Sequence, residues 1–117
     1  MKLSERKGII SIVEAAPQTK QDITERISRS RNDIRALGVK KLGLFGSFVR
    51  EDQETGSDVD LLVEFEPDAK TFDNFMTLSF LLEDVLQHRV ELVTIESLSP
   101  YIGPHVLEEM EHVLLFD

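Results

Sequence analysis

The sequence predicts an α/β or α+β fold, in which helices pack on a small β-sheet. Segments with helical periodicity alternate with short runs of branched apolar residues, in the order helix, strand, strand, helix, strand, helix. The 117 residues suit one domain with a modest core, and 41% of them are hydrophobic, as in globular proteins. We expect a single domain over residues 1–117, with residues 1–20 as an N-terminal helical extension.

The first part of the chain is expected to be helical. Residues 3–15 have the apolar spacing of a weak helix, which Pro17 ends. Thr19 or Gln18 is expected to open a second helix. Gly38 follows that helix, where a left-handed backbone is needed. One face of the second helix carries its apolar residues, which are Ile23, Ile27, Ile34 and Leu37.

Three segments rich in branched apolar residues are predicted to be strands, namely residues 39–45, 58–65 and 89–94. Between the last two lies a predicted helix over residues 71–87, with Thr71 as its N-cap. Its helical spacing predicts that several large side chains belong to the core: Phe72, Phe75, Met76 and Phe80.

The C-terminal part is predicted to hold a further short helix. Ser97 or Ser99 is a candidate cap, and Pro100 and Pro104 fit the first turns. Residues 111–117 suit either a helix end or an edge strand. Tyr101 is expected to pack. The three histidines, at positions 88, 105 and 112, are expected at or near the surface, and they are not expected to be metal ligands, since none has a second histidine at metal-ligand spacing.

Charge is distributed unevenly along the chain. The formal net charge is −9, with a balance of +6 over residues 1–50 and −15 over residues 51–117. An acidic surface repels phosphate backbones, which argues against nucleic acid as the main partner. It suits metal ions or a basic protein, although solubility alone would also account for it.

Other function classes are excluded by composition. The chain has no cysteine, which rules out disulfides and thiolate metal sites. The first residues lack the pattern of a signal peptide, and no apolar stretch approaches the ~18 residues of a membrane span. We therefore expect a cytoplasmic protein with no membrane partner.

Two carboxylates, Asp58 and Asp60, lie on the second predicted strand, about 7 Å apart along one face. Neighbouring anions repel each other unless a cation lies between them. Hard oxygen ligands select Mg²⁺ or Mn²⁺. The alternative is that Asp58 caps the strand and Asp60 lies at a solvent edge, since Asp-x-Asp pairs are common by chance.

Gly46 and Ser47 follow the first predicted strand and precede a short helical segment. A glycine lets a phosphate approach the backbone, and the serine hydroxyl adds a donor. The alternative for this pair is a plain turn. A phosphate cradle one loop before a metal-binding carboxylate pair is the combination that a nucleoside triphosphate with its metal requires.

The run "LGLFGSFVREDQETGSDVDLLVEF", followed by a helix, "RVELVT" and "ESLSPYIGPHVLEEM", resembles the minimal nucleotidyltransferases (MNT domains) of the DNA polymerase β-like superfamily. The resemblance covers residues 22–116. It implies the nucleotidyltransferase fold, a small mixed β-sheet flanked by helices. It further implies that Gly46 and Ser47 hold the triphosphate, and that Asp58 and Asp60 bind two Mg²⁺ or Mn²⁺ ions.

Three more positions take their expected roles from this resemblance. Glu91 aligns with a third family carboxylate, usually aspartate, and is expected to ligate metal or to serve as the base. The alternative is that Glu91 is an exposed carboxylate on a strand. Arg50 is expected to contact phosphates or to pair with an acid on a strand. Glu51 stands where the family has glycine. Its side chain brings a negative charge near the mouth of the site, unless that side chain points outward.

The resemblance implies the antitoxin of a type VII-like HEPN/MNT toxin–antitoxin system, which transfers AMP from ATP to a hydroxyl of the HEPN toxin, expected to be a tyrosine. Two metal ions would promote that transfer. One alternative is an antitoxin that neutralises its toxin by binding alone, and another is a nucleotidyltransferase for antibiotics or other small molecules. The sequence leaves open whether the chain forms a homo- or a hetero-oligomer.

Overall fold

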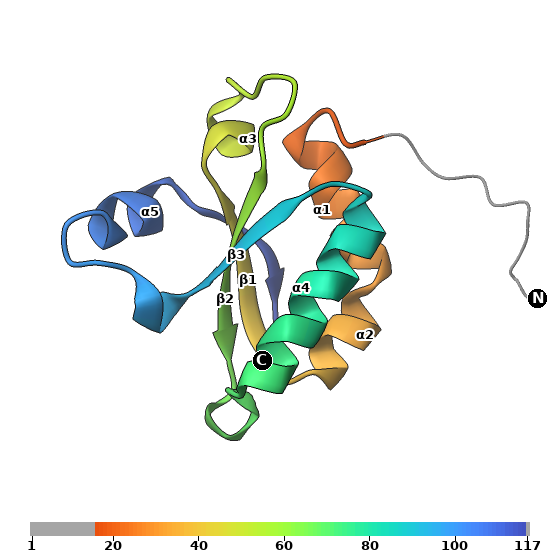
Figure 1. Ribbon diagram of the computed structural model, residues 1–117, viewed down its shortest axis with the longest axis vertical. Coiled ribbons are helices and arrows are strands. Elements are labelled where there is room, and N and C mark those ends of the chain that lie inside the picture. Colours follow the sequence, from red (N-terminus) through yellow and green to blue (C-terminus); the bar gives the residue numbers. More distant parts are fainter. Residues whose placement is uncertain (1–15, 117) are drawn as a thin grey trace, which may run out of the picture.

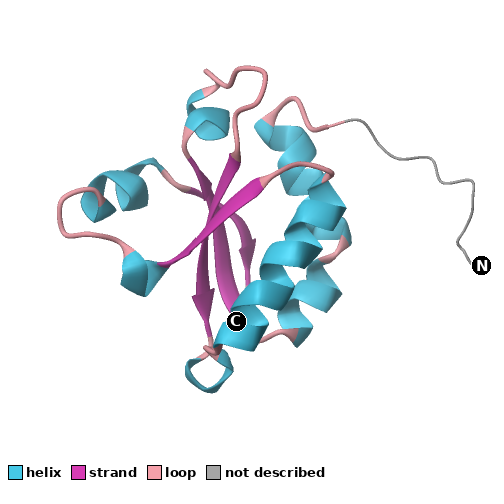
Figure 2. Cartoon of the chain, viewed as in Figure 1, coloured by secondary structure: helices cyan, strands magenta, loops and turns pink. Residues whose placement is uncertain are grey.

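In the computed structural model, residues 16–116 are described, and their strands form one four-stranded mixed sheet in the order β3-β2-β1-β4. Strand β1 pairs antiparallel with both β2 and β4, whereas β2 pairs parallel with β3 (Figure 2). The expected fold class, a small mixed sheet flanked by helices, is confirmed. The strands are β1 (Val39–Phe45), β2 (Val59–Phe65), β3 (Val90–Thr94) and β4 (Glu111–Leu115).

The helices lie on both sides of this sheet. Helices α1 (Lys20–Arg29), α2 (Arg31–Ala36) and α4 (Phe72–Leu86) form a layer on one side, while α5 (Gly103–Glu109) lies on the other side (Figure 1). The short helix α3 (Ser47–Arg50) follows β1 directly. The described residues also form two 3-10 turns, η1 (Pro67–Ala69) and η2 (Ile95–Ser97).

Thr19 opens α1 as predicted. Its side chain accepts a hydrogen bond from the Asp22 N–H, and the Asp22 carboxylate accepts one from the Thr19 N–H, which makes a capping box. The single helix expected up to residue 37 is divided at Ser30, which has non-helical dihedrals of φ −108° and ψ 18°. The helix expected over residues 3–15 lies outside the described residues.

Gly38 ends this helical part in the left-handed region, with φ +82°. A Cβ at this position would lie 2.1 Å from the Cβ of Ala69. The predicted need for glycine is confirmed, because both the backbone conformation and the close neighbour exclude a side chain.

The core lies between the sheet and the layer of α1, α2 and α4. Alternate residues of β2 supply its centre, since Val59, Leu61 and Val63 have no exposed surface. The fully buried side chains opposite them come from the three helices and are Ile23, Ile27, Ile34, Leu78, Leu82 and Leu86. Alternate residues of β2 therefore form the inward face of this strand.

The predicted inward face of α4 is partly wrong. Phe72 and Phe80 are 76% and 64% exposed, and Phe75 is only partly buried. The residues that face the sheet are four apart, at Leu78, Leu82 and Leu86, and form a single stripe. Phe80 lies two residues beyond Leu78, about 200° around the helix, and therefore points away from the core.

The C-terminal elements differ in detail from the prediction. Helix α5 has Ile102 at its N-cap position, and Pro104 lies in its first turn. Ser99 instead accepts hydrogen bonds from the backbone N–H groups of Tyr101 and Ile102 in the preceding turn. Tyr101 is 85% exposed, so the expectation that it packs is wrong.

Strand β4 lies at one edge of the sheet, which decides the two predictions for residues 111–117 in favour of an edge strand up to Leu115. The histidines are at or near the surface as expected, with His88 half-buried and His105 and His112 exposed. Within residues 16–116, no helix has the length and apolar character needed to cross a membrane.

Candidate functional site

The predicted site residues meet at one end of the sheet. Because β1 runs antiparallel to β2, its last residue, Phe45, lies opposite Asp60 near the start of β2. Strand β3 runs parallel to β2, and Glu91 lies opposite Asp60 in that register. Neighbouring residues in register share a face of the sheet, so the topology brings the Asp60 and Glu91 side chains together directly beside Gly46.

The Asp60 carboxyl is half-buried in this cluster, and its pKa is raised to about 6. Burial is the main cause, followed by the negative charge of Glu91, a hydrogen bond between the two carboxyl groups, and the charge of Asp58. Arg50 acts in the opposite direction. The charges of Glu91 and Asp58 therefore lie close enough to affect the ionisation of Asp60.

Gly46 connects β1 to α3 in a conformation that other residues avoid, with φ +80° and ψ −153°. A Cβ built on it would lie 2.1 Å from Oδ2 of Asp60. Glycine is thus needed here for two reasons, the backbone dihedrals and the approach of the carboxylate.

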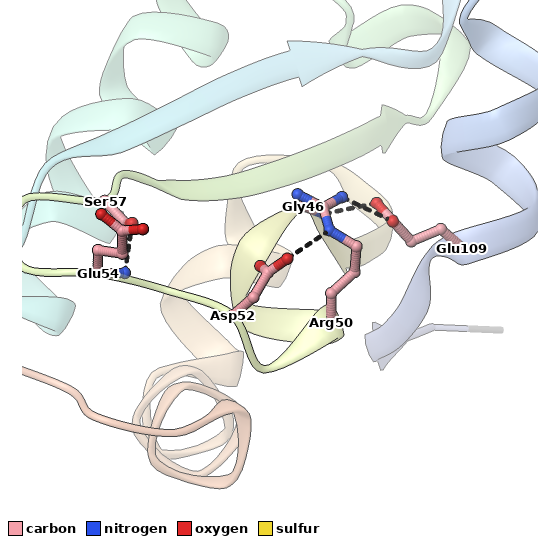
Figure 3. A network of polar contacts seen from close by, with 6 residues as sticks. All are labelled: Gly46, Arg50, Asp52, Glu54, Ser57 and Glu109. Carbon is pink, nitrogen blue, oxygen red and sulfur yellow. Dashed lines mark hydrogen bonds and ion pairs between the residues drawn. The ribbon is translucent and has the colours of Figure 1, made fainter.

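The backbone N–H of Gly46 and the side chain of Arg50 both bind the carboxylate of Glu109, the last residue of α5. Gly46 donates to Glu109 Oε2 at 2.8 Å, and Arg50 Nη1 donates to Glu109 Oε1 at 2.8 Å (Figure 3). Arg50 Nε also contacts Asp52 Oδ2 at 3.3 Å. These two ion-pair partners of Arg50 lie outside the strands, while its charge also acts on Asp60 of β2.

Sequence reasoning did not identify Glu109. It lies 63 residues from Gly46, in a helix whose local pattern contains no signal of this contact. Burial of the Glu109 carboxyl opposes its ionisation, but the Gly46 N–H and the Arg50 guanidinium outweigh burial and lower its pKa. The carboxylate is therefore charged at neutral pH.

Glu51 ends α3 in the left-handed region, with φ +63° and ψ +33°, and it is exposed. This conformation explains why glycine suits the position, since a residue with a Cβ is strained there. Of the two possibilities predicted for Glu51, an outward-pointing side chain fits its exposure.

Asp58 lies directly before β2, after a loop that Ser57 closes by accepting a hydrogen bond from the Glu54 N–H at 2.8 Å (Figure 3). Oδ1 of Asp58 is 3.0 Å from Arg89 Nη2, an ion pair without hydrogen-bond geometry. That oxygen is buried and has no hydrogen-bond partner. Oδ1 of Asp58 is thus paired in charge with Arg89 but receives no hydrogen bond.

A pocket of about 400 Å³ opens at this end of the sheet. Four of the six predicted site residues line it, while Ser47 and Asp58 do not. A larger hollow of about 760 Å³ runs along α1 and α2 and contains none of the six. The lining of the smaller pocket is Phe45, Gly46, Arg50, Asp60, Glu91, Ile102, His105, Val106 and Glu109.

The carboxylate cluster fits a hard divalent cation in its chemistry, because its donors are all oxygens. A cation could be bound by Oδ1 of Asp58, which receives no hydrogen bond, and it would offset the repulsion that adds to burial in raising the pKa of Asp60. Among residues 16–116, however, no three acidic, histidine or cysteine side chains are arranged to hold a metal ion. Joint ligation by Asp58, Asp60 and Glu91 therefore stays a prediction.

Comparisons with known proteins agree with this geometry. Residues 25–113 match the family model of the nucleotidyltransferase domain. The protein adenylyltransferase MntA of Thermococcus cleftensis is 36% identical over 96 residues, which cover 81% of this chain and 96% of that protein.

Solved structures show the same fold. A candidate minimal nucleotidyltransferase superposes with a TM-score of 0.72 and 28% identity, over 83% of this chain and 98% of the other. The tri-AMPylated HEPN toxin of Shewanella oneidensis in complex with MNT antitoxin gives a TM-score of 0.59 at 21% identity, over 83% of this chain and 73% of the matched chain.

The matched domain spans most of the chain, and the pocket at the end of the sheet carries residues of the family motif. The chain belongs to the nucleotidyltransferase domain family, and it is a nucleotidyltransferase enzyme of the minimal type.

Proposed function

We propose that the chain is an antitoxin that transfers AMP from ATP to a hydroxyl group of a HEPN-type toxin, with tyrosine as the acceptor. The observation that carries this proposal is the pocket in which Asp60 and Glu91 lie beside Gly46 and Arg50. The adenylyltransferase name of the MntA relative and the AMPylated toxin in the S. oneidensis complex support the choice of group and acceptor protein.

In the proposed reaction, the acceptor oxygen attacks the α-phosphorus of ATP and forms a phosphodiester bond. The bond from that phosphorus to the bridging oxygen of the β-phosphate breaks, and pyrophosphate leaves with the electron pair. The hydroxyl proton passes to a carboxylate. Glu91 is our candidate because this residue is exposed to solvent.

Each site residue has a proposed task in this scheme. Asp58, Asp60 and Glu91 would hold divalent ions, which when bound neutralise the triphosphate and lower the pKa of the acceptor hydroxyl. Gly46 leaves room for a phosphate and offers its N–H, and Ser47 adds a hydroxyl donor. Arg50 contributes positive charge beside the same glycine.

The charge distribution suits a basic protein partner. Residues 51–117 carry a balance of −15, and complementary charge speeds the encounter of two proteins. An RNA-binding surface on a ribonuclease toxin would be basic, so an acidic antitoxin surface would be attracted to it. We infer the partner class from this charge together with the relatives named above.

The test is to incubate the purified chain with α-labelled ATP, Mg²⁺ and the HEPN protein encoded beside it. We expect label on the toxin, and at least a roughly 100-fold loss of labelling with Asp60→Asn, because one ligand charge is removed. Glu64→Gln is the matched control, since Glu64 lies on the same strand but pairs with Lys40 and Lys41 outside the pocket.

The second candidate is neutralisation by binding without AMP transfer. It is favoured by the internal partners that already occupy Asp58, Gly46 and Arg50. Full neutralisation of the toxin by Asp60→Asn, with no label transferred by the unchanged chain, would establish this candidate and reject the proposed transfer.

A further inference from the structure

The carboxylate of Glu109 occupies the hydrogen-bond donors of Gly46 and Arg50, which the proposed function assigns to phosphate. Glu109 accepts from the Gly46 N–H through one oxygen and from Arg50 through the other, each at 2.8 Å (Figure 3). A carboxylate with both oxygens engaged in this way presents the same charge and acceptor pattern as a phosphate oxygen pair.

We propose that Glu109 is a resident anion that competes with the phosphates of the nucleotide, so that triphosphate binding requires its release from Gly46 and Arg50. This inference rests on the proposed function of the pocket as the nucleotide site. It assigns to α5 a part in controlling access to that site.

The competition follows from the number of donors. Gly46 has a single N–H, and a phosphate oxygen cannot take it while Glu109 Oε2 lies at 2.8 Å. A triphosphate brought beside a charged Glu109 would also face a third nearby anion in addition to Asp60 and Glu91, all of which line the pocket. Release of Glu109 removes that repulsion and makes the Arg50 charge available.

Release demands little rearrangement of the fold. The Glu109 side chain is 24% exposed and the Arg50 side chain 52%, so the pair lies at the pocket surface. Glu109 is the last residue of α5, which lies on the opposite side of the sheet from the main helical layer (Figure 1). Rotation of this side chain into solvent would leave the core residues between the sheet and that layer untouched.

The neighbouring residue supplies a matched control. Glu108 is exposed on the same helix and does not line the pocket. Glu108→Gln and Glu109→Gln remove the same charge, and the amide that Glu109→Gln introduces would keep an oxygen that can accept from the Gly46 N–H. Any difference between the two variants therefore reports the ionic contact with Arg50 rather than the overall charge.

The experiment measures the affinity of inorganic tripolyphosphate and of ATP, each with Mg²⁺, by calorimetry on the full chain. We expect Glu109→Gln to bind both probes about 3- to 10-fold more tightly than the unchanged chain, because a charge-assisted contact no longer has to be broken. Glu108→Gln should change affinity less than about 2-fold. Equal effects of the two variants, or weaker binding by Glu109→Gln, would overturn the inference.

A second measurement needs no variant. The amide of Gly46 and the Arg50 Nε–H should shift in NMR spectra when tripolyphosphate is added, together with backbone amides near the end of α5. Shifts at Gly46 that leave the end of α5 unmoved would contradict release of Glu109.

The outcomes also separate this inference from the proposed function. Tighter phosphate binding by Glu109→Gln without any AMP transfer to a toxin would keep the inference and reject the transfer. AMP transfer to the toxin, together with equal phosphate affinities of Glu108→Gln and Glu109→Gln, would keep the proposed function and reject the inference. Absence of binding by every variant would reject both.

Discussion

The helix-covered side of the sheet and its pocket end are held together by different forces. On the covered side, Leu61 and Leu82 are fully buried, and nearly all of the buried side chains are apolar. At the pocket end, Gly46 and Arg50 contact Glu109 through hydrogen bonds and charge, while Asp60 stays half-buried among acids. This small chain thus gathers its apolar contacts in one region and keeps repulsive charge in the other.

The covered side should therefore be the more sensitive to truncation. We expect Leu61→Ala to lower the free energy of unfolding by about 2–5 kcal/mol, since it leaves a cavity in the middle of the core. Leu107→Ala, at a side chain of α5 that is 44% exposed, should change it by less than about 0.5 kcal/mol. Chemical denaturation measures both, and similar losses would show that the two regions do not differ in this way.

Gly46 lies at the pocket end, but a substitution there should lower the stability as much as a substitution in the core. Gly46→Ala should cost about 2–4 kcal/mol, because the dihedrals are strained for alanine and its Cβ would meet Asp60. Gly56 is the control, since it has φ +91° but nothing within 4 Å of a built Cβ. Gly56→Ala should cost about 1 kcal/mol. Equal losses in denaturation would mean that the Asp60 contact has no effect on stability.

Asp60 should destabilise the chain at neutral pH. Its folded pKa of about 6 lies above the ordinary 3.8, so between these values the folded state binds more protons and stability falls as pH rises. Because the group is half-exposed, we expect Asp60→Asn to be more stable by only about 1 kcal/mol above pH 7. The difference should vanish near pH 4.

Denaturation curves of Asp60→Asn and the unchanged chain at several pH values measure this effect. A stability difference between the two proteins that stays constant from pH 4 to pH 8 would argue against a raised pKa of Asp60. Stabilisation together with lost AMP transfer would show that the carboxylate serves function at the expense of stability.

Glu51 offers the smallest effect. Glu51→Gly should raise the stability by about 0.5–1 kcal/mol, because relief of left-handed strain exceeds the added flexibility of glycine. Thermal denaturation measures it, with Glu54→Gly in the neighbouring loop as a control outside the positive-φ positions. A loss of stability with Glu51→Gly would mean that its side chain makes a contact that offsets the strain.

The same comparison explains how much could be predicted from the sequence. Local patterns sufficed for the strands, for the cap at Thr19 and for the glycine at position 38, because each depends on nearby residues. They failed for Phe72 and Phe80, because the prediction gave more weight to the size of these apolar side chains than to the leucines spaced four residues apart, which face the sheet.

Of the six residues that the motif predicted at the pocket end, four line the pocket, while Ser47 and Asp58 do not. The contacts of Glu109 and Arg89 were not predictable in the same way. Glu109 contacts Gly46, which lies 63 residues earlier in the chain. Arg89, directly before β3, pairs with Asp58, directly before β2. Such pairs are set by the three-dimensional arrangement of elements, and their local sequence carries no sign of them.

We propose that the carboxylates at the pocket end bind a nucleotide together with a divalent cation. Calorimetric titration of ATP into the unchanged chain, with and without Mg²⁺ and alongside Asp60→Asn, tests it most directly. We predict ATP binding that requires Mg²⁺ and is lost in Asp60→Asn although that variant stays folded. ATP binding of equal strength without Mg²⁺, or undiminished binding by Asp60→Asn, would contradict the claim.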